Sequence, residues 1–337
     1  MPTADQVLAR ALDGALDLAV VPGYSALGYR LRRRFWAPEP KLSLEHHRVL
    51  VTGASSGIGE AICEQLARRG AVVHMLARDP DRGARARERV AVRLGIDAGV
   101  DVAERLQLEL CDLADLGAVR DFAGRFAGSV DELTGLVHNA GVLTSARERS
   151  VDGHELTFAT GVLAPFLLTR LLGPALRRAR AATVVFVSSA GMYTARLAPD
   201  DLELDRREFD GPRFYAHAKR AQVVLAELLA ERFEGGTTAF ASMHPGWVDT
   251  PGLRDSLPRF HQLTRPILRD PGQGADTATW LIGAGDAAKR AGEFWHDRRP
   301  RPKHLLPWTR EAPADRDQLW SELIRITAPY ELPGATQ

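Results

Sequence analysis

The sequence predicts an α/β protein with one doubly wound parallel sheet of about seven strands and helices on both of its faces. Two observations predict this fold class. Apolar, β-rich runs alternate with helical patterns along most of the chain, and the first of these runs ends in a glycine-rich turn at residues 53–59. Strands that alternate with helices form parallel sheets covered on both faces. The 337 residues, 45% of them hydrophobic, suffice for one large domain.

The expected elements follow one another as repeated strand–helix units. Strands are expected where apolar and β-branched residues run together, at 48–52, 71–77, 104–110, 134–138, 182–188, 237–243 and near 293–296. Helices are expected where apolar residues recur at helical spacing, at 58–69, 80–93, 113–127, 154–178, 214–233 and 273–285. In such a sheet the ligand crevice lies at the carboxyl ends of the strands. The residues expected at those ends are Thr52, Ala77, Asp112, Asn139, Ser189 and Pro245.

The turn after the first strand is spaced Gly-x-x-x-Gly-x-Gly and leads directly into a helical pattern. Gly53 permits a tight turn, Gly57 lets the backbone approach a pyrophosphate, and Gly59 lets the helix pack close to the strand. The turn therefore predicts a dinucleotide site of the Rossmann type. The turn residues expected to contact the cofactor are Gly53, Ser55, Ser56, Gly57, Ile58 and Gly59.

Tyr215 and Lys219 are four residues apart in a predicted helix, so they share one of its faces. A phenol has a pKa of about 10 in solution, but a nearby cation favours the phenolate and lowers that pKa. Alone, the pair also suits an exposed helix that forms ion pairs. Beside a dinucleotide turn it predicts an acid–base couple.

Three further segments fit one family in register with these two motifs: His138–Gly141, Val187–Ser189 and Pro245–Thr250. With them, the chain resembles the short-chain dehydrogenase/reductase superfamily over most of its length. It resembles especially the retinol-dehydrogenase-like members, which insert a longer segment between the serine and the tyrosine. The resemblance implies an oxidoreductase with a Rossmann-type fold, acting on a CH–OH group.

The resemblance also implies roles for individual residues. Tyr215 gives or takes the proton on the substrate oxygen, and Lys219 lowers the pKa of Tyr215 and holds the nicotinamide ribose. Ser189 hydrogen-bonds the substrate oxygen, with Ser188 as the alternative. Further cofactor contacts are expected from Asp112, Leu113, Asn139, Ala140, Gly141, Pro245, Gly246, Val248 and Thr250.

Substrate contacts are expected from the insertion after Ser189 and from the stretch around Thr250. The candidates are Ser189, Met192, Tyr193, Trp247, Leu253, Leu257 and Phe260. Apart from the serine they present mainly apolar surface, so the expected substrate is a small apolar carbonyl compound or alcohol, retinoid-, steroid- or lipid-like.

The end of the second strand indicates which nicotinamide cofactor is preferred. An acidic residue there would bind the ribose hydroxyls of NAD, whereas this chain has Ala77 followed by Arg78. The planar guanidinium of Arg78 suits a 2′-phosphate, and Arg82 is placed to assist. The sequence therefore predicts NADP(H), although an arginine-rich chain also places solvated arginines at such positions.

One residue departs from the family pattern. Resembling families carry Asn at the position of Gly161, where it anchors a water that links the lysine to solvent. This departure puts the proton relay in question and supports a second hypothesis, an NADPH-binding regulatory or scaffold module with little turnover.

Two segments flank the catalytic domain, which we expect at 46–300: an N-terminal extension, 1–45, and a C-terminal tail, 301–337. Residues 4–20 have apolar side chains at helical spacing, and residues 29–36 interleave basic and aromatic ones. A helix packed on the domain is the favoured interpretation. A peripheral membrane contact is the alternative, and a membrane-surface adaptor would be a third function.

Composition excludes several other functions. A formal net charge of +1 provides no overall field to recruit nucleic acid. The two cysteines, Cys63 and Cys111, form no disulfide framework and suit a reducing, cytoplasmic compartment. His46, His47 and His296 lack partners at the spacing of metal ligands, so we expect no metal. A homo-oligomer is compatible with all of this.

Overall fold

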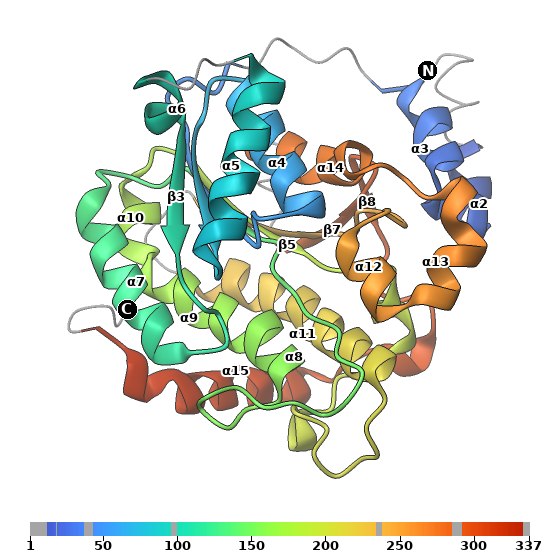
Figure 1. Ribbon diagram of the computed structural model, residues 1–337. Helices are drawn as coiled ribbons and strands as arrows, with labels where there is room; N and C mark the ends of the chain where they lie inside the picture. The colour runs from blue at the N-terminus through green and yellow to red at the C-terminus, as the bar shows by residue number, and fades with distance from the viewer. Residues whose placement is uncertain are drawn as a thin grey trace, which may run out of the picture.

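A computed structural model describes residues 12–17, 19–36, 43–95, 100–233, 238–284 and 292–332. Within these ranges the core is one sheet with helices on both faces (Figure 1). Its strands are β1 (Arg48–Thr52), β2 (Val72–Ala77), β3 (Leu106–Leu110), β4 (Gly135–His138), β5 (Ala182–Val187), β6 (Thr238–Met243), β7 (Glu293–His296) and β8 (Arg299–Arg301). They lie in the order β3-β2-β1-β4-β5-β6-β7-β8, and all neighbours are parallel except β7 and β8. The predicted fold class is confirmed.

The long helices form a layer on each face. They are α4 (Gly57–Arg68), α5 (Pro80–Leu94), α7 (Leu116–Ser129), α9 (Ala164–Leu171), α11 (Gly211–Arg232), α14 (Pro271–Gly283) and α15 (Pro313–Thr327). Shorter helices are α2 (Val20–Tyr24), α3 (Ala26–Arg33), α6 (Val100–Arg105), α8 (Leu156–Phe158), α10 (Gly173–Arg178), α12 (Pro251–Ser256) and α13 (Pro258–Thr264). Helices α4, α5 and α14 cover one face, whereas α7, α9 and α11 cover the other.

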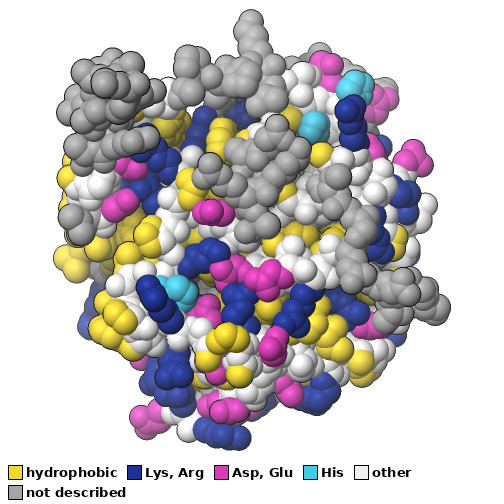
Figure 2. All heavy atoms as spheres, turned by 180° about the vertical axis from the view of Figure 1, so that it is seen from behind, with side chains coloured by type: hydrophobic (Ala, Val, Ile, Leu, Met, Phe, Trp, Pro, Cys, Tyr) yellow, Lys and Arg dark blue, Asp and Glu magenta, His cyan; other side chains and the backbone are white. Residues whose placement is uncertain are grey.

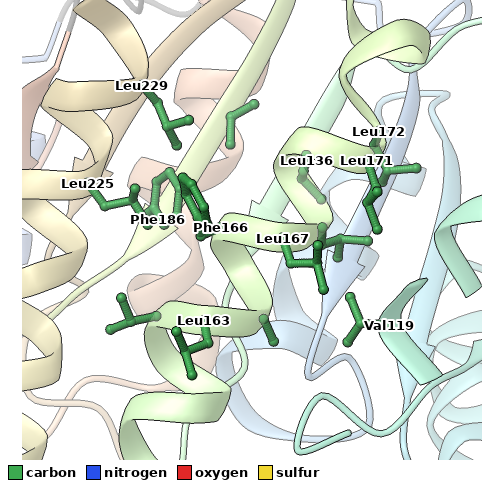
Figure 3. Close-up of a cluster of buried hydrophobic side chains, with 14 of the residues drawn as sticks. Val119, Leu136, Leu163, Phe166, Leu167, Leu171, Leu172, Phe186, Leu225 and Leu229 are labelled. Atoms are coloured by element: carbon green, nitrogen blue, oxygen red, sulfur yellow. The ribbon is translucent and has the colours of Figure 1, made fainter. Parts of the chain in front are cut away.

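Alternation along the strands explains why both faces are covered. In β1, Val49 and Val51 contribute to the cluster under α4 and α14, and Leu50 between them contributes to the cluster under α7 and α9. Successive side chains of a strand point to opposite faces, so an uninterrupted apolar strand needs a helix on each side. Figure 3 shows the second cluster, in which Phe166 of α9 and Phe186 of β5 lie together.

Three elements differ from those expected. The sheet has eight strands in place of about seven, because the short β8 turns back antiparallel to β7. Residues 104 and 105 belong to α6, and β3 begins only at Leu106. The helix expected at 154–178 is divided into α8, a π-helical turn η1 (Ala159–Leu163), α9 and α10. A proline at residue 165 removes one backbone donor from that helix, which accounts for the wider turn before it.

The described part of the N-terminal extension packs on the domain. The buried guanidinium of Arg32 donates to Asp13 at 2.7 Å and to Asp297 at 2.9 Å. Residues 1–11, where much of the amphipathic pattern lies, are outside the described part of the chain, as are residues 37–42. None of the described helices is long and apolar enough to span a bilayer.

The C-terminal helix α15 also packs on the domain. The expected boundary at residue 300 falls inside β8, and α15 lies beside α11, where Arg316 pairs with Glu227 and Glu231 at 2.6 Å each. Figure 2 views the molecule from behind Figure 1 and shows basic and acidic side chains intermixed among the described residues.

Candidate active site

The glycine turn forms a cradle at the end of β1. Gly53 and Gly57 have φ values of +65° and +58°, which side chains rarely adopt. A Cβ on Gly59 would lie 2.2 Å from the carbonyl oxygen of Gly53, and a Cβ on Gly57 would lie 3.1 Å from Thr250. The close packing predicted for Gly59 is therefore present, and the turn opens at the N-terminus of α4.

Asn139 fastens this turn to the end of β4. Its side-chain amide donates to the carbonyl oxygens of Thr52 at 3.1 Å and Gly53 at 3.2 Å. The backbone N–H groups of Asn139 and Ala140 both donate to the Thr52 hydroxyl at 3.0 Å. The preceding His138 is buried, bonds to the Thr169 hydroxyl at 2.8 Å and has its pKa lowered by burial to about 3, so it is a neutral packing residue.

A groove of about 350 Å³ runs from the glycine turn to the ends of β2 and β3. Arg78 is exposed at its rim, and Ala77 is buried beside it. The nearby carboxylate of Asp79 is engaged, because it caps α5 by accepting from the Arg82 N–H at 2.8 Å. Asp112 accepts from a backbone N–H two residues later at 2.9 Å. The other expected cofactor residues along the groove are Gly53, Ser55, Ser56, Gly57, Ile58, Leu113, Asn139, Ala140, Gly141 and Thr250.

The two serines after β5 have different surroundings. Ser188 is buried and donates its hydroxyl to the carbonyl oxygen of Lys219 at 2.8 Å, which ties β5 to α11. Ser189 accepts from the Gly191 N–H at 3.2 Å and keeps its own proton available. Both border the same cleft, but the hydroxyl of Ser188 is already committed.

Tyr215 and Lys219 lie side by side on α11, and Lys219 Nζ is 5.3 Å from the centre of the Tyr215 ring. Burial raises the pKa of Tyr215 to about 12 and lowers that of Lys219 to about 7. In the protein alone, burial thus acts against the lowering of the Tyr215 pKa that is predicted for Lys219, and that role of Lys219 stays a prediction. The ammonium donates to the carbonyl of Val187 at 2.9 Å and to Oε1 of Gln222 at 3.1 Å, and a group at the edge of neutrality stabilises a phenolate only weakly.

A second cleft, of about 390 Å³, lies against Tyr215 and Ser189. Besides Ser189, four of the predicted substrate residues line it: Trp247, Leu253, Leu257 and Phe260. Pro245, Gly246 and Val248, predicted as cofactor contacts, border this cleft and not the groove. The two cavities share Ile58, Gly141, Thr250 and Gly252, so the groove opens into the apolar chamber that Tyr215 lines.

Met192 and Tyr193 lie elsewhere. The 3-10 turn that follows Ser189 carries them toward β7, where both pack with Val223 and Phe294. The Tyr193 hydroxyl donates to the carbonyl of Pro302 at 2.7 Å. Their predicted place in the chamber is wrong, because the sequence does not show which way the chain runs after Ser189.

Two features of the site were not predicted. Gln222, three residues after Lys219 and on the same side of α11, contacts the lysine; that spacing was a usable signal. The Ser256 hydroxyl donates to the carbonyl of Leu143 at 2.9 Å and so fastens α12 over the chamber. No local sequence pattern predicts that contact, because Ser256 and Leu143 are 113 residues apart in the chain.

Comparison with known proteins gives a consistent result. A family model described as short chain dehydrogenase matches residues 47–198. Dehydrogenase/reductase SDR family member 12 from Bos taurus is 37% identical over 299 residues, which cover 88% of this chain and 91% of that protein. Retinol dehydrogenase 12 from Mus musculus is 33% identical over 252 residues, which cover 74% of this chain and 77% of that protein.

Solved structures share the fold. A short chain dehydrogenase from Salmonella enterica superposes with a TM-score of 0.61 at 24% identity, covering 78% of this chain and 100% of that one. A short chain dehydrogenase from Escherichia coli, solved in complex with NADPH, also has a TM-score of 0.61 at 24% identity, covering 77% and 100%.

Proposed function

Because the chain belongs to the short-chain dehydrogenase/reductase family, in its retinol-dehydrogenase-like branch, we propose that this oxidoreductase transfers hydride between NADP(H) and a small apolar carbonyl compound or alcohol. One observation supports the proposal most strongly. Tyr215 and Ser189 line an apolar chamber that is joined to a glycine-cradled groove. A reaction between a bound dinucleotide and an apolar substrate requires these two neighbouring spaces.

The residues present fit a dinucleotide. The cradle around Gly53 and Gly57 leaves room for a pyrophosphate at the N-terminus of α4, where backbone N–H groups and the helix dipole favour anions. A Cβ on Gly141 would lie 3.4 Å from Lys219 Nζ, so this glycine keeps the lysine accessible from the groove. Lys219 then holds the nicotinamide ribose, and the nicotinamide supplies or accepts the hydride.

The preference for NADP(H) rests on Arg78. This exposed guanidinium follows the neutral Ala77, and Asp79, the nearest carboxylate in the chain, is occupied as a helix cap. A bidentate, charge-assisted contact to a 2′-phosphate suits arginine. The NADPH held by the Escherichia coli relative is in keeping with this assignment.

In the reduction direction, hydride adds to the carbonyl carbon and a proton must reach the oxygen. With its pKa raised to about 12, Tyr215 is a neutral phenol at pH 7 and donates that proton. Ser189 offers its hydroxyl to the same oxygen as negative charge develops. We assign this role to Ser189 and not to Ser188, whose hydroxyl is bonded to Lys219 O.

The chamber favours an apolar substrate. Trp247, Leu253, Leu257 and Phe260 provide apolar walls, and the ring of Trp247 packs edge-on against Phe260 at 5.2 Å. A retinoid-, steroid- or lipid-like aldehyde or ketone matches that lining and a volume of about 390 Å³.

Gly161 supports a second candidate, an NADPH-binding module with little turnover. An NADPH-consumption screen over apolar aldehydes and ketones separates the two, with nicotinamide fluorescence measured in parallel. We expect NADPH binding and oxidation by at least one apolar carbonyl compound. Binding without oxidation across the whole series would favour the module, and the absence of binding would contradict both.

A peripheral membrane contact through residues 1–45 is a separate proposal. Val20, Val21 and Leu27 are exposed on α2 and α3. Sedimentation with liposomes tests it, comparing the native protein with a Val21→Asp/Leu27→Asp variant. Equal sedimentation of the two proteins would remove these residues from any membrane contact.

A further inference from the structure

The carbonyl group of Gly161 lacks its ordinary helical donor. In an α-helix it would accept from the N–H four residues later, but that residue is Pro165, which has none. The chain widens here into the π-turn η1, in which the Ala164 N–H donates to the carbonyl of Ala159. Leu163 and Phe166 on either side of the turn lie in the apolar core (Figure 3).

Gln222 of α11 supplies the missing donor. Its Nε2 donates to the carbonyl oxygen of Gly161 at 2.7 Å, and its side chain is fully buried. A buried carbonyl without a donor destabilises the fold, so this bond alone gives Gln222 a structural role.

The other end of the same amide contacts Lys219. Gln222 Oε1 accepts from Lys219 Nζ at 3.1 Å, while the Val187 carbonyl accepts a second proton of the ammonium at 2.9 Å. An ammonium has three N–H donors, so a third remains beyond these two bonds, and a Cβ on Gly141 would lie only 3.4 Å from Nζ. The amide thus couples the π-turn to the catalytic lysine and fixes where its remaining proton points.

We propose that Gln222 is a positioning residue for Lys219, supplying from α11 the amide that the family pattern places at position 161. Its catalytic consequence rests on the proposed function, whereas its contact with Lys219 does not. The space around Gly161 is consistent with Gln222 taking the place of an Asn at this position. A Cβ on Gly161 would lie 3.7 Å from Ala218 Cβ and 3.9 Å from Gln222 Nε2. A methyl group fits there, but an Asn side chain would compete with Gln222 for the same volume.

The surroundings of Lys219 make the contact measurable. Tyr215 and Gln222 face it from α11, the Val187 carbonyl from β5 and Gly141 from the loop after β4. None of these groups is a carboxylate, and the low pKa of Lys219 comes from burial. A change at residue 222 therefore acts on the lysine without a competing acid.

The test is a direct titration of the lysines. The chain has only four, Lys41, Lys219, Lys289 and Lys303, so [13C]lysine labelling gives four side-chain signals that Lys→Arg variants assign. The series comprises the native protein, Gln222→Met, Gln222→Glu and the control Gln65→Met. Gln65 also donates to a backbone carbonyl at 2.7 Å, that of Gly272, but it contacts no lysine in the described structure.

Gln222→Met removes the acceptor at nearly constant shape and should lower the pKa of Lys219 by about one pH unit. Gln222→Glu keeps the acceptor and adds a negative charge, so it should raise that pKa by about one to three pH units. Gln65→Met should leave it unchanged. An unchanged Lys219 pKa in folded Gln222→Met would overturn the proposal; if that variant does not fold, an unchanged pKa in Gln222→Glu would do so.

Pro165→Ala separates the structural role from the positioning role. It gives the Gly161 carbonyl a backbone donor, so adding Gln222→Met should then cost less stability while still lowering the pKa of Lys219. A pKa restored to the native value in the double variant would show that Gln222 acts only on the turn. NADPH titration of the same proteins distinguishes the two proposals: a native protein that binds no NADPH refutes the proposed function and leaves the lysine titration valid.

Discussion

The nucleotide end and the substrate end of the cleft are built in different ways. At the nucleotide end, Gly53, Gly57 and Gly59 come from one continuous stretch, and Asn139 joins them from the adjacent strand β4. At the substrate end, the Trp247 N–H donates to the carbonyl of Tyr24 at 2.8 Å, so the wall of the chamber rests on the N-terminal extension. Most residues of the nucleotide end are therefore close together in the sequence, whereas those of the substrate end come from distant parts of the chain.

Arg269 holds the substrate end together. Its buried guanidinium donates to the carbonyls of Tyr24 at 3.1 Å and Pro245 at 3.3 Å, and to both carboxylate oxygens of Asp297 at 2.6 and 2.9 Å. Gly246, with φ at +84°, passes so close that a Cβ would lie 2.2 Å from Arg269 Nε. The N-terminal extension is therefore part of the site's framework. The following changes test each end separately, from the largest expected effect to the smallest.

Tyr215→Phe changes a residue that lines the chamber, and it should leave the framework of the nucleotide end and of the substrate end intact. It removes the proton donor, so turnover on an accepted substrate should fall by about two to four orders of magnitude. NADPH affinity and the free energy of unfolding should change little, because the hydroxyl forms no hydrogen bond to either end within the described part of the chain. Steady-state kinetics and fluorescence titration measure this, and full activity in the variant would reduce Tyr215 to a packing residue.

Asp297→Asn should break the substrate end. It leaves the guanidinium of Arg269 without its buried carboxylate and removes one of the carboxylates around Arg32, which keeps Asp13, so the free energy of unfolding should fall by about 3 to 5 kcal/mol. Exposed Asp317→Asn is the control, expected at about 0 to 1 kcal/mol. Urea unfolding measures both values. An equal loss of unfolding free energy in Asp297→Asn and Asp317→Asn would show that the buried ion pairs of Asp297 do not hold the substrate end together.

The same aspartate predicts a pH dependence. Burial by itself would raise the pKa of Asp297, but the neighbouring His296 and the positive charges of Arg269 and Arg32 outweigh it and hold that pKa well below its usual range. A depressed carboxyl pKa stabilises the fold above the unfolded-state pKa of about 3.9. That contribution is lost as the pH falls below about 4, so the stability gap between native protein and Asp297→Asn should narrow there.

Arg78→Ala should weaken only the nucleotide end. We expect the native protein to bind NADPH at least about tenfold more tightly than NADH, since a charge-assisted contact contributes roughly 1.5 to 3 kcal/mol. The variant should lose most of that preference and keep its unfolding midpoint. Equal affinity of the native protein for both cofactors would refute the assignment of Arg78 to the 2′-phosphate.

Gly246→Ala should disturb the substrate end slightly. The new Cβ meets Arg269 and imposes a positive φ on alanine, at a cost of about 1 to 3 kcal/mol. Gly128→Ala in α7 is the control, because nothing lies within 4 Å of its Cβ, its φ is not positive, and it lines neither cavity. The Michaelis constant for the substrate should rise in the first variant more than NADPH affinity falls. Identical behaviour of the two variants would argue against the close packing.

The sequence predicted the nucleotide end because each of its parts has a local physical cause. A positive φ demands glycine at Gly53 and Gly57, and alternation of strands with helices demands a parallel sheet. It missed β8, a strand of only three residues with no periodicity. It missed the division of helix 154–178 although Pro165 stood inside that range, since apolar spacing outweighed the lost donor.

By itself, the sequence determined the fold, the cradle for a dinucleotide, and the pairing of Tyr215 with Lys219 on one helix face. Tertiary structure alone decided what surrounds that pair. Burial, a property of the whole fold, raises the pKa of Tyr215 and lowers that of Lys219, opposite to the effect expected from their mutual charge. Chain segments far apart in the sequence likewise bring Gln222 to Gly161 and Tyr24 to Trp247. Such contacts depend on how helices and strands pack, and no local spacing encodes them.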